Sequence, residues 1–146
     1  MSLDKVFDIA GSGMSAQSLR LNTVASNIAN AETVSSSTGD TYRARNPVFA
    51  TIFNAEQATG ASLFSDEQQA GAGVQVLGIV ESAAELEPRY EPDHPMANEE
   101  GYVFYPNVNV VEEMANMMAA SRSYQTNVEV MNTAKTMLQR VLTLGQ

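Results

Sequence analysis

Apolar residues recur at heptad spacing at both ends of the chain. One series runs from Leu3 to Ile28 and the other from Val110 to Leu142, each with steps of four and three residues. Since this spacing keeps a stripe of side chains on one face of an α-helix, the two series predict long helices that pack through apolar seams. No other feature of the sequence restricts the fold as strongly.

The amino-terminal seam has one polar member, and Ser2 precedes it as an N-cap candidate. A helix over residues 3–30 would be about 42 Å long at 1.5 Å per residue. Gly11 and Gly13 lie in its interior, where each glycine costs about 1 kcal/mol relative to alanine. We therefore expect either a bend there or the close approach of a neighbouring backbone. The seam residues are Leu3, Phe7, Ala10, Met14, Gln17, Leu21, Val24 and Ile28.

The carboxyl-terminal seam has a well-marked start. Asn109 is the predicted N-cap, with Glu112 three residues later and Pro106 closing off the preceding segment. A second apolar stripe accompanies the last half of this segment, so the helix requires more than one partner helix. The seam residues are Val110, Met114, Met117, Ser121, Tyr124, Val128, Met131, Lys135, Leu138 and Leu142.

The residues between these helices follow a different period. Alternating or β-branched and aromatic runs predict strands at 73–81, 87–92 and 101–106, with 45–53 as a fourth candidate and a turn at 92–95. The fold class is therefore α+β: two long terminal α-helices packed as a coiled coil plus a small central antiparallel β region. We expect a helical core from residues 1–40 and 106–146, and a β-rich outer region from 41–105 with a flexible loop at about 54–73.

Charge and composition exclude several functional classes. The net charge is −9, and no Lys and Arg cluster is present to bind nucleic acid. Residues 41–105 carry ten acids and three bases, whereas residues 106–146 carry three of each, as expected if the ends pack together and the middle faces water. No apolar run approaches the roughly 18 residues of a membrane span, and the amino end lacks the pattern of a cleaved signal, so we expect no direct membrane insertion.

Candidates for chemistry are few. His94 is the only histidine and lies in the predicted turn, while Glu99 and Glu100 are adjacent and would point to different sides of a strand. The run Gly71 to Gly73 lacks the spacing of a dinucleotide site, and the absence of cysteine excludes thiolate ligands. We therefore predict no catalytic residue, no metal site and no cofactor.

Methionines in the carboxyl-terminal segment leave two hypotheses open. Helical Met stripes are usually core, but flexible Met side chains also line grooves that accept varied partners. Two helices of this length with a small sheet would leave their outer stripes wet, which favours helices that pack between many chains. The alternative is a soluble helical binding module with a Met-rich partner groove. The residues concerned are Met114, Met117, Met118, Met131 and Met137.

Three stretches resemble one family. "LNTVASNIANAET" (21–33) and "YRARNPVF" (42–49) are similar to the amino-terminal signature of the bacterial flagellar axial proteins, the rod, hook and hook-associated subunits. The segment from "NVNVVEEM" (107–114) to the end resembles their carboxyl-terminal signature, in the version carried by short proximal rod subunits. The resemblance covers about residues 2–50 and 88–146.

This resemblance implies a structural, non-enzymatic subunit that polymerises into the rod, the helical driveshaft that crosses the periplasm. It implies export by the flagellar type III apparatus without a cleaved signal. The implied partners are copies of the chain and other rod proteins of the FlgB, FlgF, FlgG and FliE types. With the seams, and with Asn27 and Asn30 placed to hydrogen-bond backbone at the helix end and on an adjacent subunit, we expect subunit contacts at these residues. They are Leu3, Phe7, Met14, Leu21, Val24, Asn27, Ile28, Asn30, Val110, Met114, Met117, Tyr124, Val128, Met131, Leu138 and Leu142.

Overall fold

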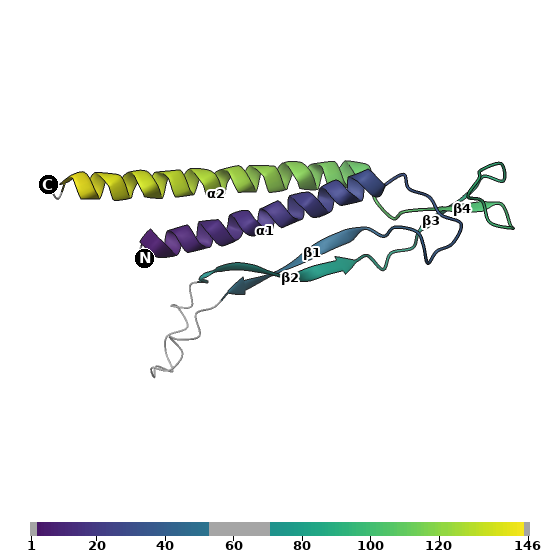
Figure 1. Ribbon diagram of the computed structural model, residues 1–146, viewed down its shortest axis with the longest axis horizontal. Coiled ribbons are helices and arrows are strands. Elements are labelled where there is room, and N and C mark those ends of the chain that lie inside the picture. Colours follow the sequence, from purple (N-terminus) through teal and green to yellow (C-terminus); the bar gives the residue numbers. More distant parts are fainter. Residues whose placement is uncertain (1–2, 53–70, 145–146) are drawn as a thin grey trace, which may run out of the picture. The chain divides into compact units, whose positions relative to one another are not determined.

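The computed structural model describes residues 3–52 and 71–144 and has two terminal helices with four short strands between them (Figure 1). This arrangement confirms the α+β class. The flexible loop expected at about 54–73 lies almost entirely outside the described residues. The elements are α1 (Leu3–Asn30), β1 (Arg45–Ile52), β2 (Gly73–Glu81), β3 (Glu87–Tyr90), β4 (Tyr102–Tyr105) and α2 (Val110–Leu144).

Both helices begin or end where local side-chain chemistry predicts. Asn109 Oδ1 accepts hydrogen bonds from the backbone N–H groups of Val111 at 3.1 Å and Glu112 at 3.3 Å, which confirms the N-cap of α2. At the end of α1, the Asn30 side chain donates to Ser26 O at 2.8 Å. The bonds to Asn109 satisfy backbone N–H groups that have no partner inside the helix.

Four strands form two antiparallel pairs. In the β1–β2 pair, Ser82 N donates to Ala44 O and Ala72 N to Ile52 O, both at 2.7 Å, at opposite ends of the ladder. In the β3–β4 pair, the register runs from Glu87 opposite Tyr105 to Tyr90 opposite Tyr102. All four predicted strands are thus confirmed, although β3 ends before the predicted residue 92 because a turn begins at Pro92.

The chain is divided into two compact units, and neither is continuous in sequence. The first unit comprises Met1–Ser18, Val48–Gly78 and Ser121–Gln146, and the second comprises Leu19–Pro47 and Ile79–Ala120. Each unit therefore combines part of α1, part of α2 and strand residues. The expected division into a helical core and a β-rich outer region is a separate prediction that these units do not address.

The glycines of α1 do not interrupt the helix, which is continuous from Leu3 to Asn30. A Cβ on Gly13 would lie 3.0 Å from Asn127 Nδ2 of α2, so the close neighbour at this point of the first unit is a side chain rather than a backbone. Ser12 Oγ accepts a hydrogen bond from Val74 N at 3.1 Å and donates to Ile9 O at 2.9 Å. A Cβ on Gly11, in contrast, would have none of the described atoms within 4 Å.

The buried apolar residues of the described segments are small. Five of the eight are alanines, so the two units contain little of the bulky aliphatic packing that usually stabilises a domain. They are Ala10, Ala16, Val24, Ala44, Leu86, Val103, Ala120 and Ala134. Neither described helix combines the length and the apolar character of a membrane span.

Candidate interaction surfaces

Large apolar side chains are exposed along α2. Near its start, Val111 is 77% exposed and Met118 69% exposed, and Met114 lies on the same side of the helix. Further along, Val130, Met137 and Val141 form a stripe with steps of seven and four residues. Burying one such side chain is worth roughly 1.5–3 kcal/mol, so a chain alone in water leaves much stabilisation unused.

The exposed face of α1 has the opposite character. From residue 15 onwards its members are small, and they lie across the helix from the buried residues Ala16, Thr23 and Asn27. Exposed helix faces usually carry long charged side chains, whereas this one allows another backbone to approach closely. The residues are Ser15, Ser18, Asn22, Ala25 and Ala29.

The predicted contact residues differ in exposure. Met114, Tyr124, Leu138 and Leu142 are exposed, and Val24 and Asn27 are buried inside their own chain. The side chain of Leu3 lies outside the description. The remaining members are half-buried: Phe7, Met14, Leu21, Ile28, Asn30, Val110, Met117, Val128 and Met131.

Asn27 is the centre of a polar junction in the second unit. It is fully buried, its Oδ1 accepts from Arg45 N and from the Tyr42 hydroxyl, and its Nδ2 donates to Arg45 O, each at 2.9 Å. Buried amides are costly without partners, and this one has three. The bonds attach the last turn of α1 to the start of β1.

A second asparagine, Asn107, bonds two further backbone segments of the same unit. Asn107 Oδ1 accepts from Ala44 N at 2.8 Å, and its Nδ2 donates to Ala84 O at 2.9 Å. Arg43 Nη1 also donates to the carbonyls of Ser82 and Ala84. Sequence reasoning missed Tyr42, Asn107 and these pairings, because the partners lie far apart in the chain and no local pattern identifies them.

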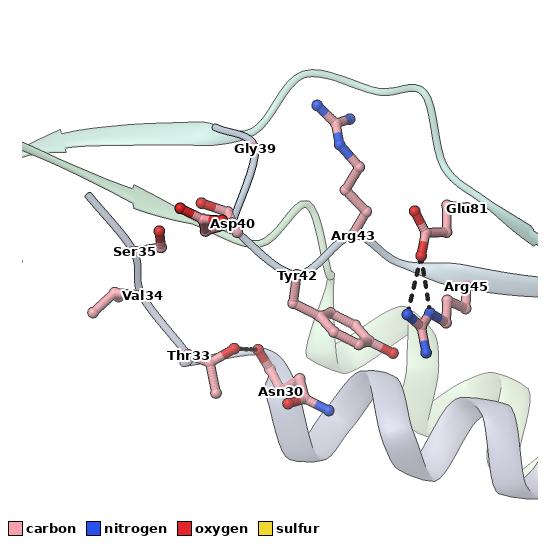
Figure 2. Close-up of a pocket in the computed structure, with 11 residues that line it drawn as sticks. Asn30, Thr33, Val34, Ser35, Gly39, Asp40, Tyr42, Arg43, Arg45 and Glu81 are labelled. Atoms are coloured by element: carbon pink, nitrogen blue, oxygen red, sulfur yellow. Dashed lines mark hydrogen bonds and ion pairs between the residues drawn. The ribbon is translucent and has the colours of Figure 1, made fainter. Parts of the chain in front are cut away.

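A polar cavity of about 430 Å³ lies where α1 leads into β1 (Figure 2). Arg45 and Glu81, which both line it, form an ion pair at 3.0 Å, with about half of each side chain exposed. Exposed ion pairs of this kind contribute roughly 0–1 kcal/mol. The cavity is lined by Asn30, Thr33, Val34, Ser35, Gly39, Asp40, Thr41, Tyr42, Arg43, Arg45 and Glu81.

The residues considered for chemistry lie in a turn. His94 Nδ1 accepts a hydrogen bond from Met96 N at 3.0 Å, so this nitrogen stabilises the turn, and Glu99 and Glu100 are exposed. Within residues 3–52 and 71–144, no group of three His, Asp or Glu side chains is arranged to hold a metal ion. The hydrogen bond from Arg89 to Glu87 raises the pKa of Arg89.

Two family models and several known proteins match this chain. The family model "Flagella basal body rod protein" matches residues 7–34, and "Flagellar basal body rod FlgEFG protein C-terminal" matches residues 99–144. The chain is 49% identical over 146 residues to flagellar basal-body rod protein FlgC of Salmonella typhimurium, with both chains covered completely. The chain belongs to the flagellar basal-body rod protein family.

Other relatives carry the same name. The FlgC proteins of Yersinia enterocolitica and Borreliella burgdorferi are 47% and 35% identical, and the matches span the whole of this chain and at least 99% of each relative. The resemblance inferred from the sequence to the rod proteins is thereby confirmed. One family-model match covers most of α1. The other covers β4 and α2.

Proposed function

We propose that the chain is a structural, non-enzymatic subunit of the flagellar basal-body rod, of the FlgC type. In this role it polymerises into the helical driveshaft that transmits motor torque across the periplasm. The observation that carries the proposal is the row of large apolar side chains exposed along α2 in a member of the rod protein family. These side chains need partners, and a rod of many copies and relatives supplies them.

The proposed contacts between subunits use the exposed and half-buried members of both seams. Heterologous contacts between different faces of the same chain generate open helical assemblies, which suits a rod. Val24 and Asn27 are buried, and Asn27 would act from inside the subunit by bonding the start of β1. In the assembly, residues 1–40 and 106–146 would form the inner tube, and residues 41–105 its outer region.

The proposed partners are further copies and other rod proteins of the FlgB, FlgF, FlgG and FliE types. Delivery would be by the flagellar type III export apparatus, with no cleaved signal peptide. The small, alanine-rich core supports this route, because a chain with little bulky packing unfolds readily before transport.

A soluble binding module with a Met-rich groove is the weaker hypothesis. Met114 and Met118 are exposed beside Val111, whereas Met117 and Met131 are half-buried, so the methionines do not gather on one surface. Membership of the rod protein family also does not favour it.

Limited trypsin digestion tests the proposal. In dilute protein we expect cleavage at Arg122, Lys135 and Arg140, which are exposed on α2, and slower cleavage at Arg20, which donates to Asn116 Oδ1 at 2.9 Å. In isolated rods the three α2 sites should be protected. Equal resistance of Arg122, Lys135 and Arg140 in the monomer and in the rod would contradict assembly through α2.

A further inference from the structure

The sheet formed by β3 and β4 presents an uncovered aromatic face. Tyr90 and Tyr102 lie opposite each other in the register, with ring centroids 5.4 Å apart and planes at 65°. Their exposed fractions are 65% and 40%, and Met96 in the connecting turn is 43% exposed. Tyr and Met are enriched at protein interfaces, where an apolar body and a polar tip are both useful.

The turn that joins the two strands is held in one shape. Asn98 Oδ1 accepts from Glu100 N at 3.0 Å and Tyr102 N at 2.8 Å, and Glu91 N donates to Gly101 O at 2.9 Å. Gly101 has a φ of +81°, and a Cβ there would lie 2.9 Å from the Tyr90 ring. Because the surface is already ordered, a partner would bind it at little cost in conformational entropy.

The charge on this turn has one sign. Residues 91–101 carry four carboxylates and no Lys or Arg: Glu91, Asp93, Glu99 and Glu100. Among the described residues none of the four forms an ion pair. The nearest cation along the strands, Arg89, is paired with Glu87 at 3.3 Å and lies 4.2 Å above the Tyr105 ring.

We propose that the β3–β4 sheet and its turn dock against a Lys- and Arg-rich surface of a different protein. A cation placed over an exposed tyrosine ring gains cation–π attraction, and the neighbouring carboxylates pair with further cations. A second copy of this chain does not offer such a surface, because it carries −9 overall and its eight Lys and Arg residues are dispersed. This contact is separate from the helix packing proposed for the rod.

Site-specific photo-crosslinking in flagellated cells tests the inference. A photoreactive phenylalanine replaces Tyr102 or Met96 in the full chain, and Met118 on α2 is the matched exposed position. We expect adducts from Tyr102 and Met96 with a protein other than this chain, and peptide mapping should place them beside Lys and Arg residues. Adducts only with copies of the chain, or none, would overturn the inference whatever Met118 gives, and Met118 adducts test the rod packing separately.

A variant that lacks three carboxylates of the turn tests the role of charge. Asp93→Asn, Glu99→Gln and Glu100→Gln together should reduce the Tyr102 adduct at least five-fold, because the attraction for the basic surface is lost. The control changes three other exposed carboxylates, Glu32→Gln, Glu112→Gln and Glu129→Gln, and should leave the adduct unchanged. An equal yield from both triple variants would contradict the charge-based docking.

Discussion

The side-chain amide of Asn27 bonds both backbone polar groups of Arg45, accepting from its N–H and donating to its carbonyl at 2.9 Å each. One side chain thus takes the place of a neighbouring strand at the first residue of β1. Since Asn27 belongs to α1, the orientation of the strand is tied to the helix through a single buried group. Removing the Asn27 side chain should therefore destabilise the subunit.

Asn27→Ala should lower the free energy of unfolding by about 2–4 kcal/mol, because Arg45 and Tyr42 lose partners inside the protein. Urea unfolding followed by circular dichroism measures the change. Asn30→Ala is the matched control: among the described residues its amide bonds only Ser26 O, so its cost should stay below about 1 kcal/mol. Arg45→Ala keeps the backbone bonds and should also cost little, and a loss as large as that of Asn27→Ala would show that the side chain of Arg45 matters instead.

Asn109→Ala should destabilise the start of α2 by about 1 kcal/mol, because two backbone N–H groups lose their acceptor. The measurement is the thermal midpoint of helicity at 222 nm. Asn109→Ser keeps an N-cap acceptor and should retain most of the stability. Identical midpoints for the Ala and Ser variants would contradict the capping role.

Gly11→Ala and Gly13→Ala should differ although both lie inside α1. At Gly11 a methyl group meets open space, so the dilute protein should gain up to about 1 kcal/mol of helix stability. At Gly13 the methyl group would press on Asn127, and the gain should be smaller or absent. Thermal unfolding of the dilute chain compares the two. In an Asn127→Ala background Gly13→Ala should recover the full gain, and failure to do so would locate the obstacle elsewhere.

Met118→Glu should prevent rod assembly without unfolding the subunit, because Met118 is 69% exposed in the single chain and would be buried in the proposed rod. The assays are swimming of a complemented strain and circular dichroism of the purified variant. Ser123→Glu adds the same charge to the same helix at an exposed polar position on another face, and it should be tolerated better. Normal swimming by the Met118 variant would remove this face from the proposed interface.

Much of the fold follows from patterns within single segments. The heptad seams locate α1 and α2, the Asn109 cap locates the start of α2, and the alternation at 73–81 gives the bounds of β2. These predictions succeed because the hydrophobic period and helix capping depend on residues only a few positions apart. They also indicate that α2 has an apolar face in excess of what one chain covers.

The junctions were not predictable in the same way. Asn27 and Arg45 are 18 residues apart, and Asn107 and Ala44 are 63 apart, so no repeat or spacing connects them. The sequence placed Asn27 among contacts to adjacent subunits, while the structure shows its three bonds within the chain. An asparagine near a helix end is compatible with both roles, and its bonds within the chain depend on a strand that begins 18 residues later.

The interleaved composition of the two units sets the order of events during biosynthesis. Each unit takes its final piece from α2, which begins at Val110 and ends at Leu144. Before the ribosome reaches Ala120 neither unit has all of its members, and the first unit still lacks its segment from Ser121 onwards. The second unit can therefore pack before the first, which stays incomplete until the part of α2 beyond Ser121 has been added.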